Sequence, residues 1–425
     1  MYFFGRSAII MLTVKTRKEI FMRKQRLARI GAATLAAVLT VQGMGFSSTV
    51  YAKEEPVRVK ADSQTQMSSE PEQVAVKDYG SNSDRTQNFD SDWKFNLGDV
   101  SNAQTPTFDD SKWRTLSLPH DYSIEQEYSQ SLEAESGYLP GGVGWYRKNF
   151  TLGEEAKGKR IRIDFDGVYM NATVYVNGKE VGTHPYGYTP FSFDITDYIS
   201  YDKENTIAVK VDHQTPSSRW YSGSGIYRSV NLTITNDVHV DLNGIKVESN
   251  NLEKEAGKTV NTDVKTTVVN GSKEAKNITI THTVFKKGEK PDKAIGTFTT
   301  EAKEVKAGEK AEISATVPVE NPKLWSVENP ELYTIRTEVK AGDKLLDTYD
   351  TEYGFRYLNF DTETGFQLNG KNVKLKGVCM HHDQGALGAV ANRRAIERQV
   401  EILQEMGCNS IRVTHNPASK DLIEV

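Results

Sequence analysis

Cysteine is nearly absent from this chain of 425 residues, which contains only Cys379 and Cys408. Two cysteines exclude the disulfide framework that holds many small secreted domains together. A metal site would also need more ligands than two thiols provide. We therefore predict that both cysteines are buried, inert packing residues.

An excess of positive charge is also lacking, because the chain has a formal net charge of −4. The charge is unevenly distributed: residues 1–52 have a net charge of +7, and the remainder has a net charge of −11. Binding to nucleic acid requires a basic face that can meet the phosphates. The acidic remainder therefore argues against nucleic acid as a partner.

Apolar runs long enough to cross a membrane are missing too. Met22 begins the basic segment MRKQRLARI, residues 31–41 form a short apolar run, and residues 50–52 (VYA) resemble a cleavage site. This order is typical of a secretory signal peptide and is too short for a membrane span. We expect Met22 to be the initiator, residues 1–21 to be an upstream extension, and the mature protein to be secreted or at the cell surface. An N-terminal anchor helix is the alternative.

Large apolar residues are scarce in residues 53–88, which are rich in Ser, Glu, Gln and Lys. Such a composition cannot bury enough apolar surface to fold alone. We predict a flexible spacer between the cleavage site and the first folded domain.

Short alternating runs dominate residues 89–235, and no long helical period occurs there. Alternation with period two is typical of strands with one buried face, and Asn177-Gly178 is a strong hairpin turn. We predict a β-sandwich. The runs that indicate its strands are 160–165, 172–176, 186–194, 206–211 and 226–234.

A second all-β stretch follows in residues 236–355. Its strands recur at a spacing that suits a seven-strand, immunoglobulin-like sandwich. We predict a spacing and packing domain without chemistry of its own. Its expected strands are 262–269, 278–285, 311–317 and 332–339.

The pattern changes in residues 356–425, where a strand, a helix and a second strand follow one another. An apolar-leaning run at 373–380 leads into the helix-period residues Ile396, Val400 and Leu403. Gly407 is well placed to end that helix, and residues 409–414 form the next strand. This is the unit of a parallel (β/α)₈ TIM barrel, which needs eight strands and about 250 residues. We therefore expect the chain to be an N-terminal fragment of a longer protein.

Polar side chains follow both strands of this unit. His381 and Asp383 stand at the exit of the first strand, and His415 and Asn416 at the exit of the second. Adjacent parallel strands lie about 4.8 Å apart, so the two imidazoles can flank one pocket. Metal binding by these histidines and Asp383 is the competing interpretation, but the adjacent His381 and His382 point in different directions. We predict no metal and no cofactor.

Arg412 lies on the face of its strand opposite Ile411 and Val413, because side chains alternate. If the apolar pair meets the outer helices, Arg412 points into the barrel, where an unpaired guanidinium would cost several kcal/mol. We therefore expect a carboxylate partner. A purely structural ion pair is the alternative to a role in a site.

Trp220 lies among small residues in SSRWYSGSGIYR. An aromatic face beside glycine-rich turns suits stacking against a sugar ring, although a buried core tryptophan is an equally good interpretation. Arg219, in the same loop, could reach a sugar hydroxyl.

The sequence resembles glycoside hydrolase family 2, and most closely the secreted bacterial β-galactosidases of that family. The resemblance covers residues 89–425. It is carried by LPHDYSIE at Leu118, GGVGWYRKNF at Gly141, FDGVYMNATVYVNGKEVGTHPYGYTPFSFDIT at Phe165, SSRWYSGSGIYR at Ser217, LWSVENPELY at Leu324, YGFR at Tyr353, KGVCMHHDQGALGA at Lys376 and NSIRVTHNPAS at Asn409.

The resemblance implies a jelly-roll sugar-binding domain, an immunoglobulin-like domain and a TIM barrel. It implies that His381 and His415 line the sugar subsite and stabilise the transition state, and that Arg412 holds a nucleophilic glutamate. Asp383, Asn416, Trp220 and Arg219 are further candidate substrate contacts.

The activity that the resemblance implies is retaining hydrolysis of a β-galactoside oligosaccharide or glycan. Retaining hydrolysis uses two carboxylic groups. In the family both are glutamates on later barrel strands, which we expect beyond Val425, so we expect no turnover by this chain alone. The alternatives are β-glucuronidase or another specificity of the family, or a non-catalytic carbohydrate-binding protein. The oligomeric state stays open, a homo-oligomer included.

Overall fold

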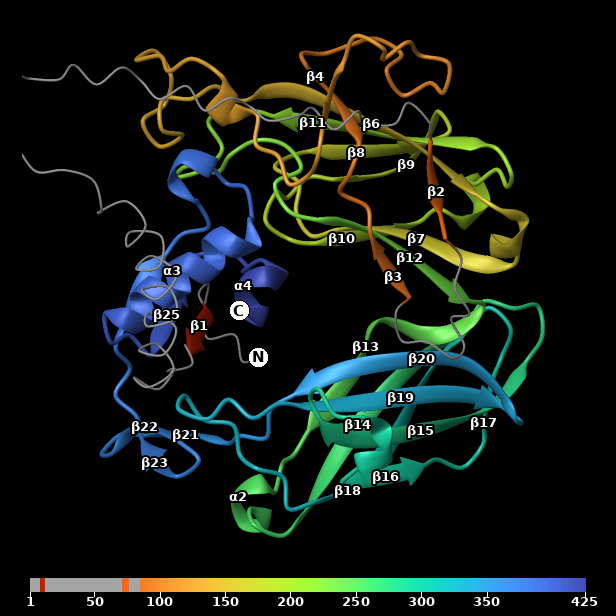
Figure 1. The fold of residues 1–425 in the computed structure, drawn as a ribbon, viewed down its shortest axis with the longest axis vertical. Coiled ribbons are helices and arrows are strands. Elements are labelled where there is room, and N and C mark those ends of the chain that lie inside the picture. Colours follow the sequence, from red (N-terminus) through yellow and green to blue (C-terminus); the bar gives the residue numbers. More distant parts are fainter. Residues whose placement is uncertain (1–7, 12–70, 76–84) are drawn as a thin grey trace, which may run out of the picture. The chain divides into compact units, whose positions relative to one another are not determined.

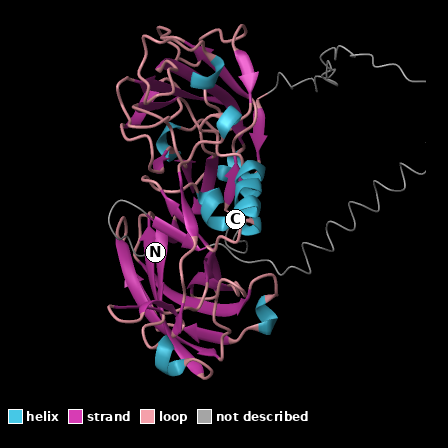
Figure 2. Cartoon of the chain, turned by 90° about the vertical axis from the view of Figure 1, so that its left-hand side faces the viewer, coloured by secondary structure: helices cyan, strands magenta, loops and turns pink. Residues whose placement is uncertain are grey.

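A computed structural model describes residues 8–11, 71–75 and 85–425 of the chain (Figure 1). The predicted signal peptide, and all of the upstream extension except residues 8–11, lie outside these residues. Strands make up most of the described chain, and its longest helix lies near the C-terminus (Figure 2). No helix in the described ranges is long and apolar enough to span a bilayer.

Two sheets form the first domain. One is a four-stranded sheet in the order β10-β7-β12-β3, and the other is seven-stranded in the order β5-β4-β6-β11-β8-β9, with β2 beside β6. The strands are β2 (Glu72–Val74), β3 (Thr86–Asn88), β4 (Trp93–Leu97), β5 (Arg114–Leu116), β6 (Gly142–Leu152), β7 (Lys159–Phe165), β8 (Ala172–Val176), β9 (Lys179–His184), β10 (Phe191–Asp194), β11 (Glu204–His213) and β12 (Val230–Asn236). Three short 3₁₀ helices are η1 (Ser123–Glu125), η2 (Glu154–Ala156) and η3 (Thr196–Tyr198).

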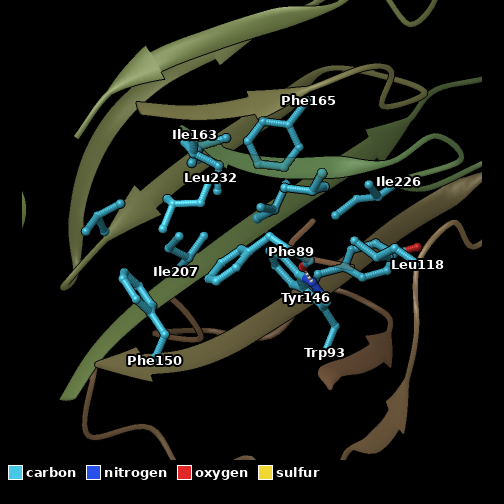
Figure 3. Close-up of a cluster of buried hydrophobic side chains, with 14 of the residues drawn as sticks. Phe89, Trp93, Leu118, Tyr146, Phe150, Ile163, Phe165, Ile207, Ile226 and Leu232 are labelled. Carbon is cyan, nitrogen blue, oxygen red and sulfur yellow. Dashed lines mark hydrogen bonds between the residues drawn. The ribbon is translucent and has the colours of Figure 1, made fainter. Parts of the chain in front are cut away.

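One apolar core lies between these two sheets (Figure 3). Ile163 and Phe165 of β7 face it from one sheet, and Phe150 of β6 and Ile207 of β11 face it from the other. The alternating sequence of each strand places these side chains on one face. Each fully buried side chain of this kind stabilises the fold by about 1.5–3 kcal/mol. The domain is therefore a two-sheet sandwich.

The first sandwich begins earlier in the chain than the sequence predicts. Within the predicted spacer, β2 pairs in parallel with β6, and Val74 is buried in the core. Arg85 is also buried, and β3 pairs with β12. The prediction of a flexible spacer up to residue 88 is therefore wrong for 71–75 and 85–88, because one valine and backbone pairing suffice to hold these short strands. The rest of the spacer lies outside the described residues.

Two of the strands predicted in the first domain are shorter in the structure. Only Phe191–Asp194 of the run 186–194 is a strand, and β12 begins at Val230 rather than at residue 226. Residues 186–190 and 226–229 belong to loops instead, and both loops contact the C-terminal part of the chain, as described below. The Asn177-Gly178 turn is present, with both residues at positive φ (51° and 80°).

The second domain is again made of two facing sheets. They have the orders β13-β14-β18 and β16-β15-β19-β20, with β17 beside β15. The elements are β13 (Val238–Glu248), α2 (Leu252–Glu255), β14 (Thr259–Asn270), β15 (Lys276–Lys286), η4 (Pro291–Lys293), β16 (Gly296–Thr299), β17 (Lys303–Val305), β18 (Lys310–Glu320), β19 (Tyr333–Ala341) and β20 (Lys344–Tyr353).

A buried ion pair joins the second domain to the first. Arg85 Nη1 lies 2.6 Å from Asp347 Oδ2, and both side chains are at most 4% exposed. The same carboxylate oxygen accepts a hydrogen bond from the backbone N–H of Val240. Burial raises the pKa of Asp347 to about 6, and the attraction of Arg85 opposes that rise.

The C-terminal segment contains the predicted strand, helix and strand. Its elements are β21 (Leu358–Asp361), β22 (Gly365–Leu368), β23 (Lys371–Asn372), β24 (Gly377–Met380), η5 (Gly385–Leu387), α3 (Arg393–Glu405), β25 (Ser410–Val413) and α4 (Lys420–Glu424). Strands β24 and β25 are parallel, and β1 (Ala8–Met11) pairs antiparallel with β25.

Local sequence explains the limits of α3. The Asn392 side chain accepts a hydrogen bond from the N–H of Ala395 and so caps the first turn. Ile396 and Val400 are buried against Ile411 and Val413 of β25. Gly407 has a φ of +86°, which a glycine adopts without strain, and it ends the helix as predicted.

The prediction for the two cysteines is half right. Cys408 is buried, but Cys379 is exposed. Cys379 pairs with Arg412 across β24 and β25 and shares its face, which is not the face packed on α3. The sequence around Cys379 is apolar on both faces of β24, so it does not indicate which face packs against α3.

Candidate functional site

Three aromatic side chains meet at the ends of β24 and β25. The ring centroids of His381 and His415 are 5.8 Å apart. Trp220, from a loop of the first sandwich, lies 5.1 Å from His381 and 5.2 Å from His415. We call these three residues the aromatic triad. The proximity of the two histidines follows from the parallel pairing of their strands, whereas that of Trp220 does not.

Two polar atoms of the triad are buried without a hydrogen-bond partner. They are Nε1 of Trp220 and Nδ1 of His381. Leaving a buried donor or acceptor unpaired costs about 1–3 kcal/mol. Such atoms are rare in folded proteins, and each one calls for an explanation, such as an ordered water, an ion or a functional role. The triad is therefore suited to bind a molecule with both an apolar face and hydroxyl groups.

Arg412 lies beside the triad's strands but has no carboxylate partner among the described residues. It is exposed, whereas Ile411 and Val413 on either side are buried, as period two requires. Its Nη1 lies 3.5 Å from Sγ of Cys379. The expected ion pair of Arg412 therefore stays a prediction, and the guanidinium can receive an anionic group.

The other predicted site residues lie around the triad. Asn416 accepts a 2.6 Å hydrogen bond from the hydroxyl of Tyr186, so its amide is held by the first sandwich. Asp383 and Arg219 are exposed. Arg219 precedes Trp220 in the chain, and Asp383 follows His381 by two residues, so both stand next to triad members.

His382 packs against residues of the first sandwich and is not a member of the aromatic triad. Its ring is 3.1 Å from the carbonyl oxygen of Ser222, to which Nε2 donates, and it packs edge-on against Tyr188 and Tyr227. Burial lowers the pKa of His382 to about 4, so the ring is neutral. His382 thus faces the sandwich. In the described part of the chain, no group of three or more His, Cys, Asp and Glu is arranged to hold a metal ion.

Asp121 was not singled out by the sequence, yet it joins three segments at the site. It is 1% exposed and accepts hydrogen bonds from four donors. These are the N–H groups of Ser123, Ser224 and Ala389 and the hydroxyl of Tyr221, at 3.0, 2.9, 2.9 and 2.5 Å. The donors are up to 268 residues away in sequence. No periodic pattern marks such a residue, and the motif LPHDYSIE is its only signal.

Further hydrogen bonds seat the start of the barrel on the sandwich. Arg228 donates to the carbonyl oxygen of Pro417 at 2.9 Å, and the N–H of Lys420 donates to Asp166 at 3.3 Å. The N–H of Ala391 donates to the carbonyl oxygen of Tyr227 at 2.9 Å. Burial raises the pKa of Asp166, and Arg228 opposes this. These contacts fix β24 and β25 relative to the Trp220 loop.

A small cavity lies beside His381, between residues of the first sandwich and residues of α3 and α4. It measures about 30 Å³ and is lined by His381, His382, Arg228 and apolar residues such as Ile396. This is room for about two water molecules and is too small for a sugar ring.

The chemistry of the site is that of binding rather than of hydrolysis by itself. The triad offers aromatic faces and unpaired hydrogen-bonding atoms, and Arg412 offers a positive charge. Asp383 is the only carboxylate at either strand exit. Hydrolysis of a glycosidic bond uses two carboxylic groups, and Asp383 alone cannot supply both.

Comparison with known proteins gives one family along the described chain. The sugar-binding domain of glycosyl hydrolases family 2 matches residues 86–236, a second domain of that family matches 238–356, and its TIM barrel domain matches 362–425. These limits agree with the three structural units described above.

The individual relatives include proteins named β-galactosidase and proteins named β-glucuronidase. The β-galactosidase BoGH2A of Bacteroides ovatus is 43% identical over 79% of this chain and 39% of that protein. A solved structure of a glycosyl hydrolase family 2 member from Bacteroides cellulosilyticus has a TM-score of 0.75 and 38% identity, covering 80% of this chain and 44% of that one. The structure of Bacteroides uniformis β-glucuronidase 2 has a TM-score of 0.70 and 34% identity, covering 80% and 40%. The chain thus spans about two fifths of the length of these relatives.

Proposed function

Because this chain belongs to glycosyl hydrolase family 2, we propose that its protein hydrolyses terminal β-D-galactosyl residues of oligosaccharides or glycans. The aromatic triad carries this proposal, since it combines stacking surfaces with two buried polar atoms that lack partners. A galactosyl ring has an apolar face and a rim of hydroxyl groups, and so it complements both features.

Each site residue has a role in this proposal. Trp220 stacks on the sugar, and its N–H donates to a hydroxyl. His381 and His415 hydrogen-bond the sugar and stabilise the charge that develops in the transition state. Arg412 holds the nucleophilic carboxylate, and Asp383, Asn416 and Arg219 are further contacts to the substrate.

The reaction proceeds with retention of configuration in this proposal. It then uses a nucleophilic carboxylate and an acid/base carboxylic group about 5–5.5 Å apart. We place both in a part of the protein that the present sequence does not include, and Arg412 faces the nucleophile. Nuclear magnetic resonance of the first product anomer tests retention: a β-anomer is expected, and an α-anomer would contradict it.

The central test measures hydrolysis by the whole natural protein. Nitrophenyl β-galactoside and nitrophenyl β-glucuronide are compared by kcat/KM under the same conditions. Preference for the galactoside supports the proposal. Preference for the glucuronide, or no hydrolysis of either, overturns it.

A β-glucuronidase is the second candidate, and one observation favours it. Arg219 is an exposed cation next to Trp220, where it could bind the carboxylate of a glucuronic acid ring. In that case Arg219→Gln lowers kcat/KM for the glucuronide by about tenfold or more and leaves the galactoside unaffected. An equal effect on both substrates argues against this reading.

We further propose that the protein is bacterial and is exported to the medium or the cell surface, with cleavage after Ala52. Support comes from the basic and apolar segments of residues 22–41. Sequencing of the N-terminus of the mature protein should find Lys53 first. We also propose a jelly-roll topology for the first sandwich and an immunoglobulin-like topology for the second domain.

A further inference from the structure

The loop Ser217–Ser224 brings Trp220 from the first sandwich to the strands of the barrel. His213 contacts both of its ends: Nε2 is 3.0 Å from Oγ of Ser217, and Nδ1 is 2.5 Å from Oγ of Ser224. His213 is 3% exposed, and burial lowers its pKa to about 4. A neutral imidazole has one donor and one acceptor, and here each meets one serine. The ends of the loop are therefore fixed to β11.

Asp121 holds the middle and the C-terminal end of the same loop. Its Oδ1 accepts from the N–H of Ser224 and its Oδ2 from the hydroxyl of Tyr221, the residue directly after Trp220. The Oδ2 atom also accepts from the N–H of Ala389, in the segment that follows His381. One carboxylate thus binds both parts of the chain that build the triad.

Two glycines show how closely these segments approach Asp121. Gly223 and Gly388 have φ values of +71° and +62°. A Cβ on Gly223 would collide with Ala389 and lie 2.7 Å from Oδ2 of Asp121, and a Cβ on Gly388 would collide with the same oxygen. Both loops are therefore shaped to bring the backbone against this carboxylate.

We propose that Asp121 is a positioning residue that holds the Trp220 loop against His381 and His415, so that the sugar subsite is formed before substrate arrives. This inference rests on the proposed glycosidase function. Four donors converge on Asp121, and asparagine cannot replace it fully, because its NH₂ group would face donors instead of accepting from them. Tyr221 is a positioning residue too, because its hydroxyl donates to Asp121 and so holds the loop that contains Trp220.

Kinetics of the whole natural protein test the proposal. Asp121→Asn and Tyr221→Phe should raise KM about tenfold, since each loses one or two charge-assisted hydrogen bonds to the loop. Asp121→Ala should lower kcat/KM about 100-fold, the effect of a misplaced binding group. A variant that is merely less folded has fewer active molecules, which lowers kcat but leaves KM unchanged.

Asp164→Asn is the matched control. Asp164 is a partly buried carboxylate of the same sandwich that accepts from Arg162, Ser192 and Thr233, and no residue of the C-terminal segment is among these donors. Its KM should stay within about twofold of the wild type. If Asp121→Asn and Tyr221→Phe also keep a wild-type KM, the proposal is overturned. These two conservative variants decide the question even where Asp121→Ala does not fold.

Amide hydrogen exchange separates the positioning role from the proposed activity. In Asp121→Asn, peptides covering 217–225 and 385–391 should exchange faster than in the wild type, and peptides of β7 and β12 should not. In Asp164→Asn the first two regions should stay protected. Unchanged exchange at 217–225 overturns the positioning role. A wild-type protein that hydrolyses neither nitrophenyl substrate overturns the function alone, since the exchange result holds without it.

Discussion

Trp220 differs from Trp145, a residue of β6 in the first sandwich, in the partner of its indole N–H. Nε1 of Trp145 donates to Asp99 at 3.2 Å, whereas Nε1 of Trp220 is buried without a partner. Trp145 is a buried residue of β6, whereas Trp220 is a partly buried loop residue, so the two differ in the surroundings of the ring as well as in the hydrogen bond. An unpaired donor of this kind is a cost to stability that a bound hydroxyl removes.

Replacement of Trp220 by phenylalanine should weaken substrate binding without weakening the fold. Phenylalanine keeps an aromatic face but cannot donate, so KM should rise about tenfold, the effect of one lost hydrogen bond. The free energy of unfolding should stay the same or rise, because a buried unpaired group disappears. Steady-state kinetics and urea unfolding of the whole protein measure the two effects.

Trp145→Phe should show the opposite pattern, with lower stability and an unchanged KM, because it leaves Asp99 without its indole donor. The proposed role of Trp220 would be wrong if Trp220→Phe lost stability and kept a wild-type KM.

At the scale of elements, the start of α3 allows the contributions of a helix cap and of exposed ion pairs to stability to be compared. Asn392 caps the helix through the N–H of Ala395 at 3.0 Å. Arg394 makes ion pairs with Glu397 and Glu401, and its side chain is 62% exposed. A cap contributes about 1 kcal/mol, and exposed ion pairs contribute about 0.2–1 kcal/mol.

Asn392→Ala should therefore destabilise the protein by about 1 kcal/mol, and Arg394→Ala by less than half of that. Asn392→Ser should restore most of the loss, since serine also accepts from a helix N–H. The midpoint of urea unfolding measures all three variants. An Arg394→Ala effect larger than that of Asn392→Ala would contradict this ranking.

The elements themselves were largely predictable from local patterns. β8 has the predicted limits, and Gly407 ends α3 as its left-handed conformation requires. Strand alternation also placed Arg412 opposite Ile411 and Val413. β2 was missed because Val74 is one apolar residue in a polar segment, and its burial depends on pairing with Leu152, 78 residues later.

The site was predictable only where neighbouring strands carry it. His381 and His415 meet because β24 and β25 are parallel neighbours. Trp220 joins them through a loop whose path is set by Asp121 and His213, and no period in the sequence encodes those contacts. The partner of Arg412 was inferred from the cost of burying a charge, and the described residues contain none.

Across the whole molecule, several buried histidines make the fold sensitive to acid. Burial lowers the pKa of four of them to about 4: His213, His239, His282 and His382. In the unfolded chain a histidine has a pKa near 6.5. Between pH 6.5 and 4 the unfolded state therefore binds more protons than the folded state, and stability falls as the pH falls. Each of these histidines can lower the free energy of unfolding by up to about 3 kcal/mol between pH 6.5 and 4.

We expect the free energy of unfolding to be constant above about pH 7 and to decrease steadily below pH 6.5. Asp347 acts in the opposite direction, because its raised pKa favours proton uptake by the folded state. Burial also raises the pKa values of Asp90 and Asp166, which act with Asp347, and it lowers those of His120 and His184, which act with the four histidines. Urea unfolding at pH 7.5, 6, 5 and 4.5 measures the slope, and stability that rose toward pH 4.5 would contradict this account.

His282→Gln isolates one contribution within the second domain. Glutamine can still donate to Oγ1 of Thr337, which His282 contacts at 3.1 Å, but it does not titrate. The variant should lose less stability between pH 6.5 and 4.5 than the wild type. An identical pH dependence would show that His282 does not contribute.

The contacts that seat the start of the barrel on the first sandwich also bear on how such proteins can be recombined. Asp121, Arg228 and Asp166 all bind backbone groups of residues 389–420. Backbone partners are available in any sequence, but only if the loops follow the same path. A chimera that takes its first sandwich from another lineage should therefore take residues 376–425 from that same lineage. Otherwise Trp220 would come from one parent protein, and His381 and His415 from the other.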